Sequence, residues 1–102
     1  MIRPIKLQTL KNKPSSFLEN HKNDMVWIRS DNGLWMEGKS GYTERYDYAG
    51  IYTLGDAYEA TSHCGPEKRV QYEPVGKEYI LMQLEHHARM ITKMSKILSQ
   101  IR

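Results

Sequence analysis

Two adjacent pairs of side chains, His63-Cys64 and His86-His87, are the clustered groups that could hold a metal ion or act as a nucleophile. Zinc is normally bound by four ligands arranged in spaced pairs. Neighbours on a helix point about 100° apart, so neither pair converges easily on one ion. A nucleophilic Cys64 would need a base and an oxyanion hole, and we expect the adjacent His63 to point away from it. The sequence therefore predicts no metal site, no cofactor and no enzymatic activity.

Aromatic and basic side chains gather in one short segment. Four of the seven tyrosines fall within residues 42–52, together with Arg45. Tyr, Trp and Arg are the residue types most enriched in binding hot spots, because they offer large area and directed hydrogen bonds. We expect Tyr42 and Tyr52 to pack in the core. The predicted partner-binding residues are Trp35, Arg45, Tyr46 and Tyr48.

The elements that must position these side chains begin with a hairpin over residues 25–37. Residues 25–29 are rich in aromatic and β-branched side chains, which is typical of a strand. Asn32-Gly33 then predicts a two-residue turn, since both residues tolerate positive φ. The returning strand begins at Leu34. The spacing favours a shared sheet face for Trp27 and Trp35.

A short helix and a third strand follow the aromatic segment. Thr53 and Asp56 form a capping pattern that predicts a helix over residues 53–64, ended by Gly65-Pro66. Residues 69–73 alternate with period two and predict a strand. The predicted fold is α+β, with a small antiparallel sheet packed on the 53–64 helix. We expect one domain, in which residues 1–24 form a basic N-terminal arm, 25–75 the body and 76–102 a helix for association.

The C-terminal segment predicts a long amphipathic helix over residues 77–102, which contain no Gly or Pro. Seven residues recur at alternating spacings of four and three, the repeat of a helix-packing seam. They are Ile80, Leu84, His87, Ile91, Met94, Leu98 and Ile101. Such a helix spans about 37 Å, whereas a compact chain of this length has a radius of gyration of about 13 Å. We therefore expect a homodimer or larger assembly, unless the helix bends back or the N-terminal arm covers it.

Charge is unevenly distributed along the chain. The formal net charge is +3, made up of +3 over residues 1–24, −3 over 25–75 and +3 over 76–102. An acidic centre between basic ends is not the footprint of one continuous nucleic-acid-binding face, and it suits attraction between the ends and the body. No run of 18 apolar residues is present, which predicts no membrane span. A single cysteine indicates a reducing compartment, and we expect a cytoplasmic protein.

Three short motifs carry a resemblance to known proteins. Gly41-Tyr42-Thr43, Ala49-Gly50-Ile51-Tyr52-Thr53 and Ala57 resemble a GYT…AG-x-YT…A pattern found in small phage and prophage proteins of unassigned function. The likeness covers residues 25–75, and it departs at Leu54-Gly55-Asp56, where those proteins usually carry two acids. It implies a mobile-element origin and action in the host cytoplasm. Small proteins of that origin often bind and inhibit host proteins, including those of defence.

Three hypotheses about function remain open at this point. The first is a phage-type protein-binding module that inhibits a host protein and self-associates through its C-terminal helix. The second is a nucleic-acid-binding accessory protein that uses the N-terminal lysines and the cations of the long helix, whose binding would weaken steeply with salt. The third is a small-ligand sponge with pockets at subunit interfaces. The cations of the second hypothesis are Lys6, Lys11, Lys13, Arg89, Lys93, Lys96 and Arg102.

Overall fold

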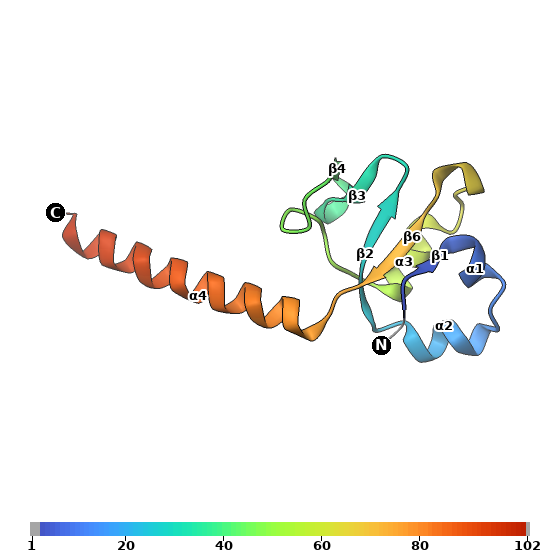
Figure 1. The fold of residues 1–102 in the computed structure, drawn as a ribbon, viewed down its shortest axis with the longest axis horizontal. Coiled ribbons are helices and arrows are strands. Elements are labelled where there is room, and N and C mark those ends of the chain that lie inside the picture. Colours follow the sequence, from blue (N-terminus) through green and yellow to red (C-terminus); the bar gives the residue numbers. More distant parts are fainter. Residues whose placement is uncertain (1–2, 102) are drawn as a thin grey trace.

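The computed structural model describes residues 3–101 and shows two regions of different shape (Figure 1). Residues 3–76 form a compact body, and a long helix projects from it. The molecule measures 60 × 27 × 16 Å, and its radius of gyration is 17.0 Å. A compact chain of this length would have a radius of about 13 Å. The projecting helix accounts for the difference.

The body contains an antiparallel sheet of six short strands. The sheet order is β1-β6-β2-β3-β4, and β5 pairs with the first residues of β2. The strands are β1 (Ile5–Lys6), β2 (Met25–Ser30), β3 (Gly33–Trp35), β4 (Tyr42–Thr43), β5 (Tyr52–Thr53) and β6 (Gln71–Pro74). The helices are α1 (Leu7–Lys11), α2 (Ser15–His21), α3 (Leu54–Thr61), α4 (Lys77–Gln100) and the short 3₁₀ turns η1 (Glu37–Lys39) and η2 (Pro66–Lys68). The predicted α+β class is confirmed.

The main core lies between one face of the sheet and α1 and α3. Val26 and Ile28 of β2 and Tyr72 of β6 are fully buried there, against Leu54 and other apolar residues. The Tyr72 hydroxyl is hydrogen-bonded to the hydroxyl of Thr61 at 2.7 Å. Burial raises the pKa of Tyr72 to about 12, because the ionised phenolate would lose its hydration.

The N-terminal segment, expected as a basic arm of the single domain, is part of the body and contributes a short strand. Ile5 pairs with Tyr72 across β1 and β6, and Leu7 and Leu10 of α1 are buried in the core. The physical reason is burial, because α1 brings both leucines onto the sheet. Residues 3–24 therefore extend the sheet and leave the long helix uncovered. The helix does not bend back either (Figure 1).

The hairpin forms as predicted, but its turn lies one residue earlier. Ser30 pairs with Gly33, so Asp31 and Asn32 are the two loop residues. Neither has positive φ, whereas Gly33 has φ of +118° at the first position of β3. This shift moves the pairing by two residues in total and leaves each residue of β3 on the same face. Trp27 and Trp35 lie on opposite faces of the sheet, contrary to the expectation, because paired residues across a two-residue turn have numbers of opposite parity.

The start of α3 agrees with the capping pattern. The hydroxyl oxygen of Thr53 accepts a hydrogen bond from the backbone N–H of Asp56 at 3.1 Å. This bond satisfies one of the free N–H groups of the first helical turn. The helix ends at Thr61, three residues before the predicted end at Cys64.

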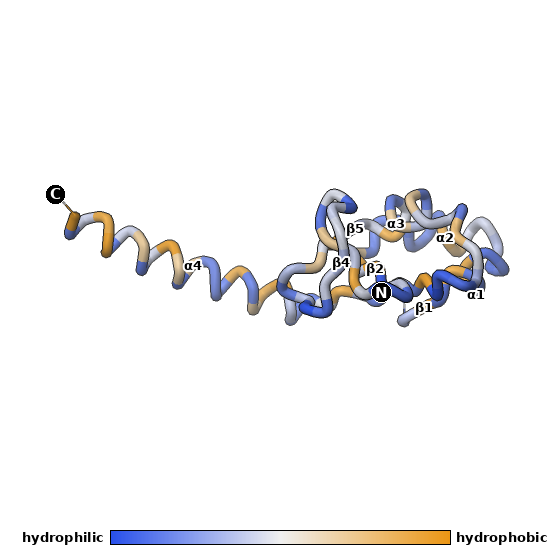
Figure 2. Tube along the Cα trace, turned by 90° about the horizontal axis from the view of Figure 1, so that it is seen from above, coloured by the Kyte–Doolittle hydropathy of each residue, from blue (hydrophilic) through white to orange (hydrophobic). Residues whose placement is uncertain are grey.

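Helix α4 leaves the body after Val75 and Gly76. Tyr79, in its first turn, packs against Trp27 with ring centroids 4.9 Å apart. Beyond this turn, the described side chains of α4 are exposed, apart from a half-buried Gln83. Hydrophobic and hydrophilic stretches follow one another along the α4 tube, as expected for a helix with one apolar face (Figure 2).

Candidate protein-interaction surfaces

The tyrosine loop, defined here as residues 44–49, connects β4 to the chain that returns toward β5. Two backbone hydrogen bonds make it compact, from Tyr48 N–H to Arg45 C=O and from Ala49 N–H to Tyr46 C=O, both at 3.2 Å. Ala49 also bridges to Met36 after β3. The loop is thereby held over the sheet face that carries Trp27.

Tyr46 is fixed to the sheet by a charged network. Its hydroxyl donates a hydrogen bond to one carboxylate oxygen of Glu73 and accepts one from the Arg29 guanidinium at 3.0 Å. Arg29 also donates to the other oxygen of Glu73, and its hydrogen bonds to Glu73 and then Tyr46 raise the pKa of Arg29 above its ordinary value. The Tyr46 ring packs edge-on against Trp27, with centroids 4.8 Å apart. Tyr46 is therefore mainly a structural anchor, with 37% of its surface exposed.

Arg45 and Tyr48 form the outer part of the tyrosine loop. The Arg45 guanidinium makes two hydrogen bonds to the Asp47 carboxylate, at 2.7 and 3.1 Å, and this pair raises the pKa of Arg45. The same guanidinium lies over the ring of Tyr48, 4.4 Å from its centroid. Tyr48 is 57% exposed. The loop thus presents an aromatic ring and a cation in a fixed arrangement, which lowers the entropy cost of binding.

Trp35 is not part of this surface. It lies on the opposite sheet face, where it packs edge-on against Tyr42 and lines a small pocket of about 290 Å³ with Lys39, Ala60 and His63. Its indole N–H is buried and has no acceptor among the described residues. Tyr42, expected in the core, is 49% exposed, whereas Tyr52 packs against the core and donates to the carbonyl of Met36. The predicted four-residue set is therefore divided between two faces.

Two residues of the anchor, Arg29 and Glu73, were not among the predicted site residues. They lie on β2 and β6, 44 positions apart in the chain. Polar side chains alternate in β6, which is the signal that could have placed Glu73 on a solvent face, whereas β2 shows no such alternation around Arg29. The register that brings them together is not visible in the sequence.

The predicted seam is exposed along the whole described length of α4. The exposed fraction of its large apolar side chains ranges from 36% at Ile80 to 70% at Leu98. His87 lies in the middle of the seam and is also exposed. Leu81, Met90 and Ile97 widen the apolar stripe on its flanks. Helices of globular proteins normally bury such a stripe against another element.

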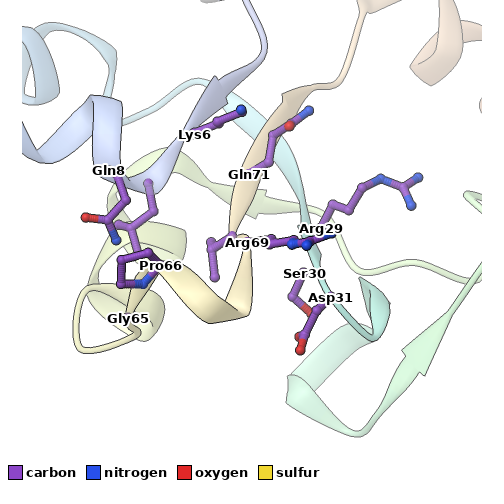
Figure 3. Close-up of a pocket in the computed structure, with 11 residues that line it drawn as sticks. Lys6, Gln8, Arg29, Ser30, Asp31, Gly65, Pro66, Arg69 and Gln71 are labelled. Carbon is purple, nitrogen blue, oxygen red and sulfur yellow. The ribbon is translucent and has the colours of Figure 1, made fainter.

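A cavity of about 670 Å³ opens beside η2, where β1 and β2 end and β6 begins (Figure 3). Lys6 and Arg69 contribute cations, and Asp31 contributes one acid. Figure 3 shows Arg69 extending toward Ser30, while the Arg29 guanidinium points away from the cavity. Arg69 itself has a left-handed backbone, with φ of +52°.

The side chains considered as a nucleophile or as metal ligands lie as follows. The Cys64 sulfur lies 3.9 Å from Nε2 of His63, so the two side chains approach each other, contrary to the expectation that they point apart. Among residues 3–101, no three His, Cys, Asp or Glu side chains are grouped as metal ligands. None of the helices described is long and apolar enough to cross a membrane.

Comparison with known proteins adds no relative, because no protein family, curated protein or solved structure matches the chain. The surfaces described above are therefore the basis for a functional assignment.

Proposed function

We propose that this chain is a small self-associating protein-binding module, which assembles through α4 and uses the tyrosine loop to bind and inhibit a host protein. The observation that carries the proposal is the exposed apolar seam of α4. The molecule exposes 7480 Å², whereas a compact chain of 12.0 kDa would expose about 6,000 Å². The excess exceeds the roughly 800 Å² that each partner buries in a standard interface.

The tyrosine loop supports the second half of the proposal. Tyr48 and Arg45 are of the types that dominate hot spots, and their stacked geometry is already formed without a partner. A rigid aromatic side chain supplies contact area while losing few rotamers on binding. The loop also adjoins the start of α4, because the Tyr79 hydroxyl donates to the carbonyl of Tyr46 at 3.3 Å. Assembly would therefore bring loops close to the packed helices.

The nature of the partner is supported by the sequence pattern alone. The GYT…AG-x-YT…A motifs over residues 41–57 resemble those of small phage and prophage proteins of unassigned function, and small proteins of that origin often bind and inhibit host proteins. No catalytic role is assigned to any residue, and inhibition would follow from occupying a surface of the host protein.

Self-association is tested by sedimentation velocity on the full chain over a range of concentrations. We expect a dimer or larger species. A monomer at all concentrations would disprove the first half of the proposal.

Partner binding is tested by capture from host lysate with the wild-type chain and with Arg45→Ala and Tyr48→Ala. The captured protein is then purified and its affinity for each variant is measured. We expect both variants to weaken binding by at least tenfold, corresponding to about 1.4 kcal/mol. Asp31→Ala, on a different loop, is the matched control and should bind as wild type. Equal affinity for all four proteins would remove the tyrosine loop from the proposal.

The nucleic-acid alternative is supported by a different observation, the cation-lined cavity near Lys6 and Arg69. Binding to DNA or RNA should fall steeply as salt is raised, because phosphate contacts release counterions. Lys6→Ala with Arg69→Ala should then reduce binding and flatten its salt dependence. Binding that does not change with salt would exclude this alternative.

A further inference from the structure

The direction in which two α4 helices pack is indicated by their charges. Both acids of the helix, Glu78 and Glu85, lie in its first half, where they balance Lys77 and Arg89. The second half, with Arg102, carries three cations and no acid. A parallel pair would place the two cationic ends side by side. An antiparallel pair would place each cationic end against the half of its neighbour that contains the acids.

We infer that α4 packs antiparallel against α4 of a second copy of this chain. This inference rests on the self-association proposed above and adds the orientation and register of the contact. It also names the occupant of the exposed seam. The surface complementary to the seam is the same seam on the second copy, running in the opposite direction.

The spacing of the seam restricts the register to steps of seven residues, and the pairing centred on residue 89 uses the seam residues between 80 and 98. Antiparallel seams pack the first apolar position of one heptad against the fourth of the other helix. Applied here, Ile80 lies opposite Leu98 of the second copy, Leu84 opposite Met94, and His87 opposite Ile91. Each pair occurs twice by symmetry, which gives six layers and uses all six seam residues between 80 and 98. The positions that flank the seam nearest the twofold axis are Ala88 on one side and Met90 on the other, so the pair encloses no charge there.

The central histidine also favours this arrangement. In a parallel pair the two His87 side chains would share one layer, and their protonated forms would repel. In the antiparallel pair each His87 faces an isoleucine, and the two imidazoles lie in separate layers.

The position of the bodies is consistent with the same orientation. Packed helices lie 8–10 Å apart, and the molecule is 27 and 16 Å wide across its long axis. A parallel pair would crowd both bodies at one end, whereas an antiparallel pair places them at opposite ends (Figure 1). The basic end of each α4 then reaches the start of the partner's α4, beside the tyrosine loop. Asp47 of that loop lies close enough to Tyr79 to raise the pKa of Tyr79, after the larger effect of burial.

Disulfide trapping on the full chain tests the orientation. The native thiol is removed by Cys64→Ser, and Ile80→Cys and Leu98→Cys are made as two separate proteins of different tagged size. The two are mixed, allowed to exchange subunits and oxidised. We expect the mixed 80–98 disulfide to exceed either homodisulfide at least tenfold. Lys96→Cys, on the outer side of the helix, is the control for random collisions.

The outcomes separate the inference from the proposal on which it rests. Homodisulfides at positions 80 and 98 that equal or exceed the mixed product would overturn the antiparallel arrangement, while self-association would stand. If the Cys64→Ser protein and the wild type both sediment as monomers before oxidation, the proposed self-association and the antiparallel arrangement are both disproved. Mixed product no greater than that of the Lys96→Cys control, from a protein that does associate, would place the contact away from this seam.

Discussion

The body buries its large apolar side chains, whereas helix α4 exposes them. In the body, residues such as Ile28, Leu34 and Leu54 are completely buried by chain segments that are distant in sequence. In α4, residues of the same types, such as Ile91 and Leu98, are 67% and 70% exposed. Burying a large apolar side chain contributes about 1.5–3 kcal/mol. The body obtains that stabilisation within one chain, whereas α4 can obtain it from another molecule.

This contrast indicates that the two regions depend on different contacts to bury their apolar side chains. The apolar pattern of the body specifies a fold, and under our proposal that of α4 specifies a contact between molecules. The link between them is small, since Tyr79 against Trp27 is the main attachment of the helix. Changes in one region should therefore leave the other largely unaffected, and the following predictions test this separation.

The largest effect is expected from introducing charge into the seam. Ile91→Asp together with Leu98→Asp should convert the assembly into monomers, because unpaired carboxylates would be buried in four layers of the pair. Sedimentation velocity measures the change, and circular dichroism should show that the signal of the sheet persists. Thr92→Asp with Ser99→Asp introduces the same charges outside the seam and should leave the assembly intact. Loss of the body fold in the seam variant would contradict the separation of the two regions.

The next largest effect concerns the hairpin. Gly33→Val should destabilise the body by about 1–3 kcal/mol, since φ of +118° is unfavourable for a β-branched residue. The new Cβ would also lie 3.1 Å from the carbonyl oxygen of Thr43 and 2.8 Å from a carboxylate oxygen of Glu44. Thermal unfolding measures the loss. Gly76→Val is the control, because its φ is −73° and no atom lies within 4 Å of the added Cβ. Equal melting temperatures for the two variants would show that Gly33 is not required for the turn.

The features that sequence reasoning found are those determined by nearby residues. The Thr53 cap acts over three positions, and the seam of α4 repeats every seven, so both are visible without knowledge of the fold. The same holds for the two strands of the hairpin. These elements define the class of the fold and the position of the long amphipathic helix.

One feature that it missed was readable from the sequence, and the others depend on distant contacts. Paired residues across a two-residue turn differ in parity, so Trp27 and Trp35 lie on opposite faces in the observed and in the expected register. Arg29, Tyr46 and Glu73 meet only after β2, β6 and the tyrosine loop are in place. The N-terminal segment joins the sheet because Leu7 and Leu10 pack in the main core, a contact with residues distant in the chain.

A smaller effect is expected from Tyr72→Phe. At neutral pH the loss should be about 1 kcal/mol, since one hydrogen bond to Thr61 is removed while Thr61 keeps its bond to the carbonyl of Ala57. The pKa of Tyr72 is about 12 in the folded chain and about 10 when unfolded. The stability linked to the neutral hydroxyl is therefore fully present below pH 10 and is lost as pH rises toward 12.

The matched measurement is the difference in melting temperature between wild type and Tyr72→Phe at pH 9 and pH 11. We expect the difference to shrink or reverse at pH 11. Ionisation of Tyr72 then stabilises the unfolded state of the wild type, and Tyr72→Phe has no such group to ionise. A constant difference would mean that Tyr72 is not as buried as the structure shows. The oligomeric state should be the same for both proteins at pH 9.

The smallest effect is expected from Cys64→Ser, which also provides the background for disulfide trapping. Cys64 is half-buried and packs against the edge of the main core, so exchange of the thiol for a hydroxyl should cost less than about 1 kcal/mol. The His63 imidazole lies 3.9 Å from the sulfur, which is too far for a hydrogen bond to a serine oxygen in the same place, so the exchange loses only a weak contact. Melting temperature, sedimentation and partner affinity should all stay close to those of wild type. A folded, assembled Cys64→Ser protein that has lost its biological effect would instead make the His63–Cys64 pair a reactive centre, and the tyrosine loop would no longer be the best candidate for function.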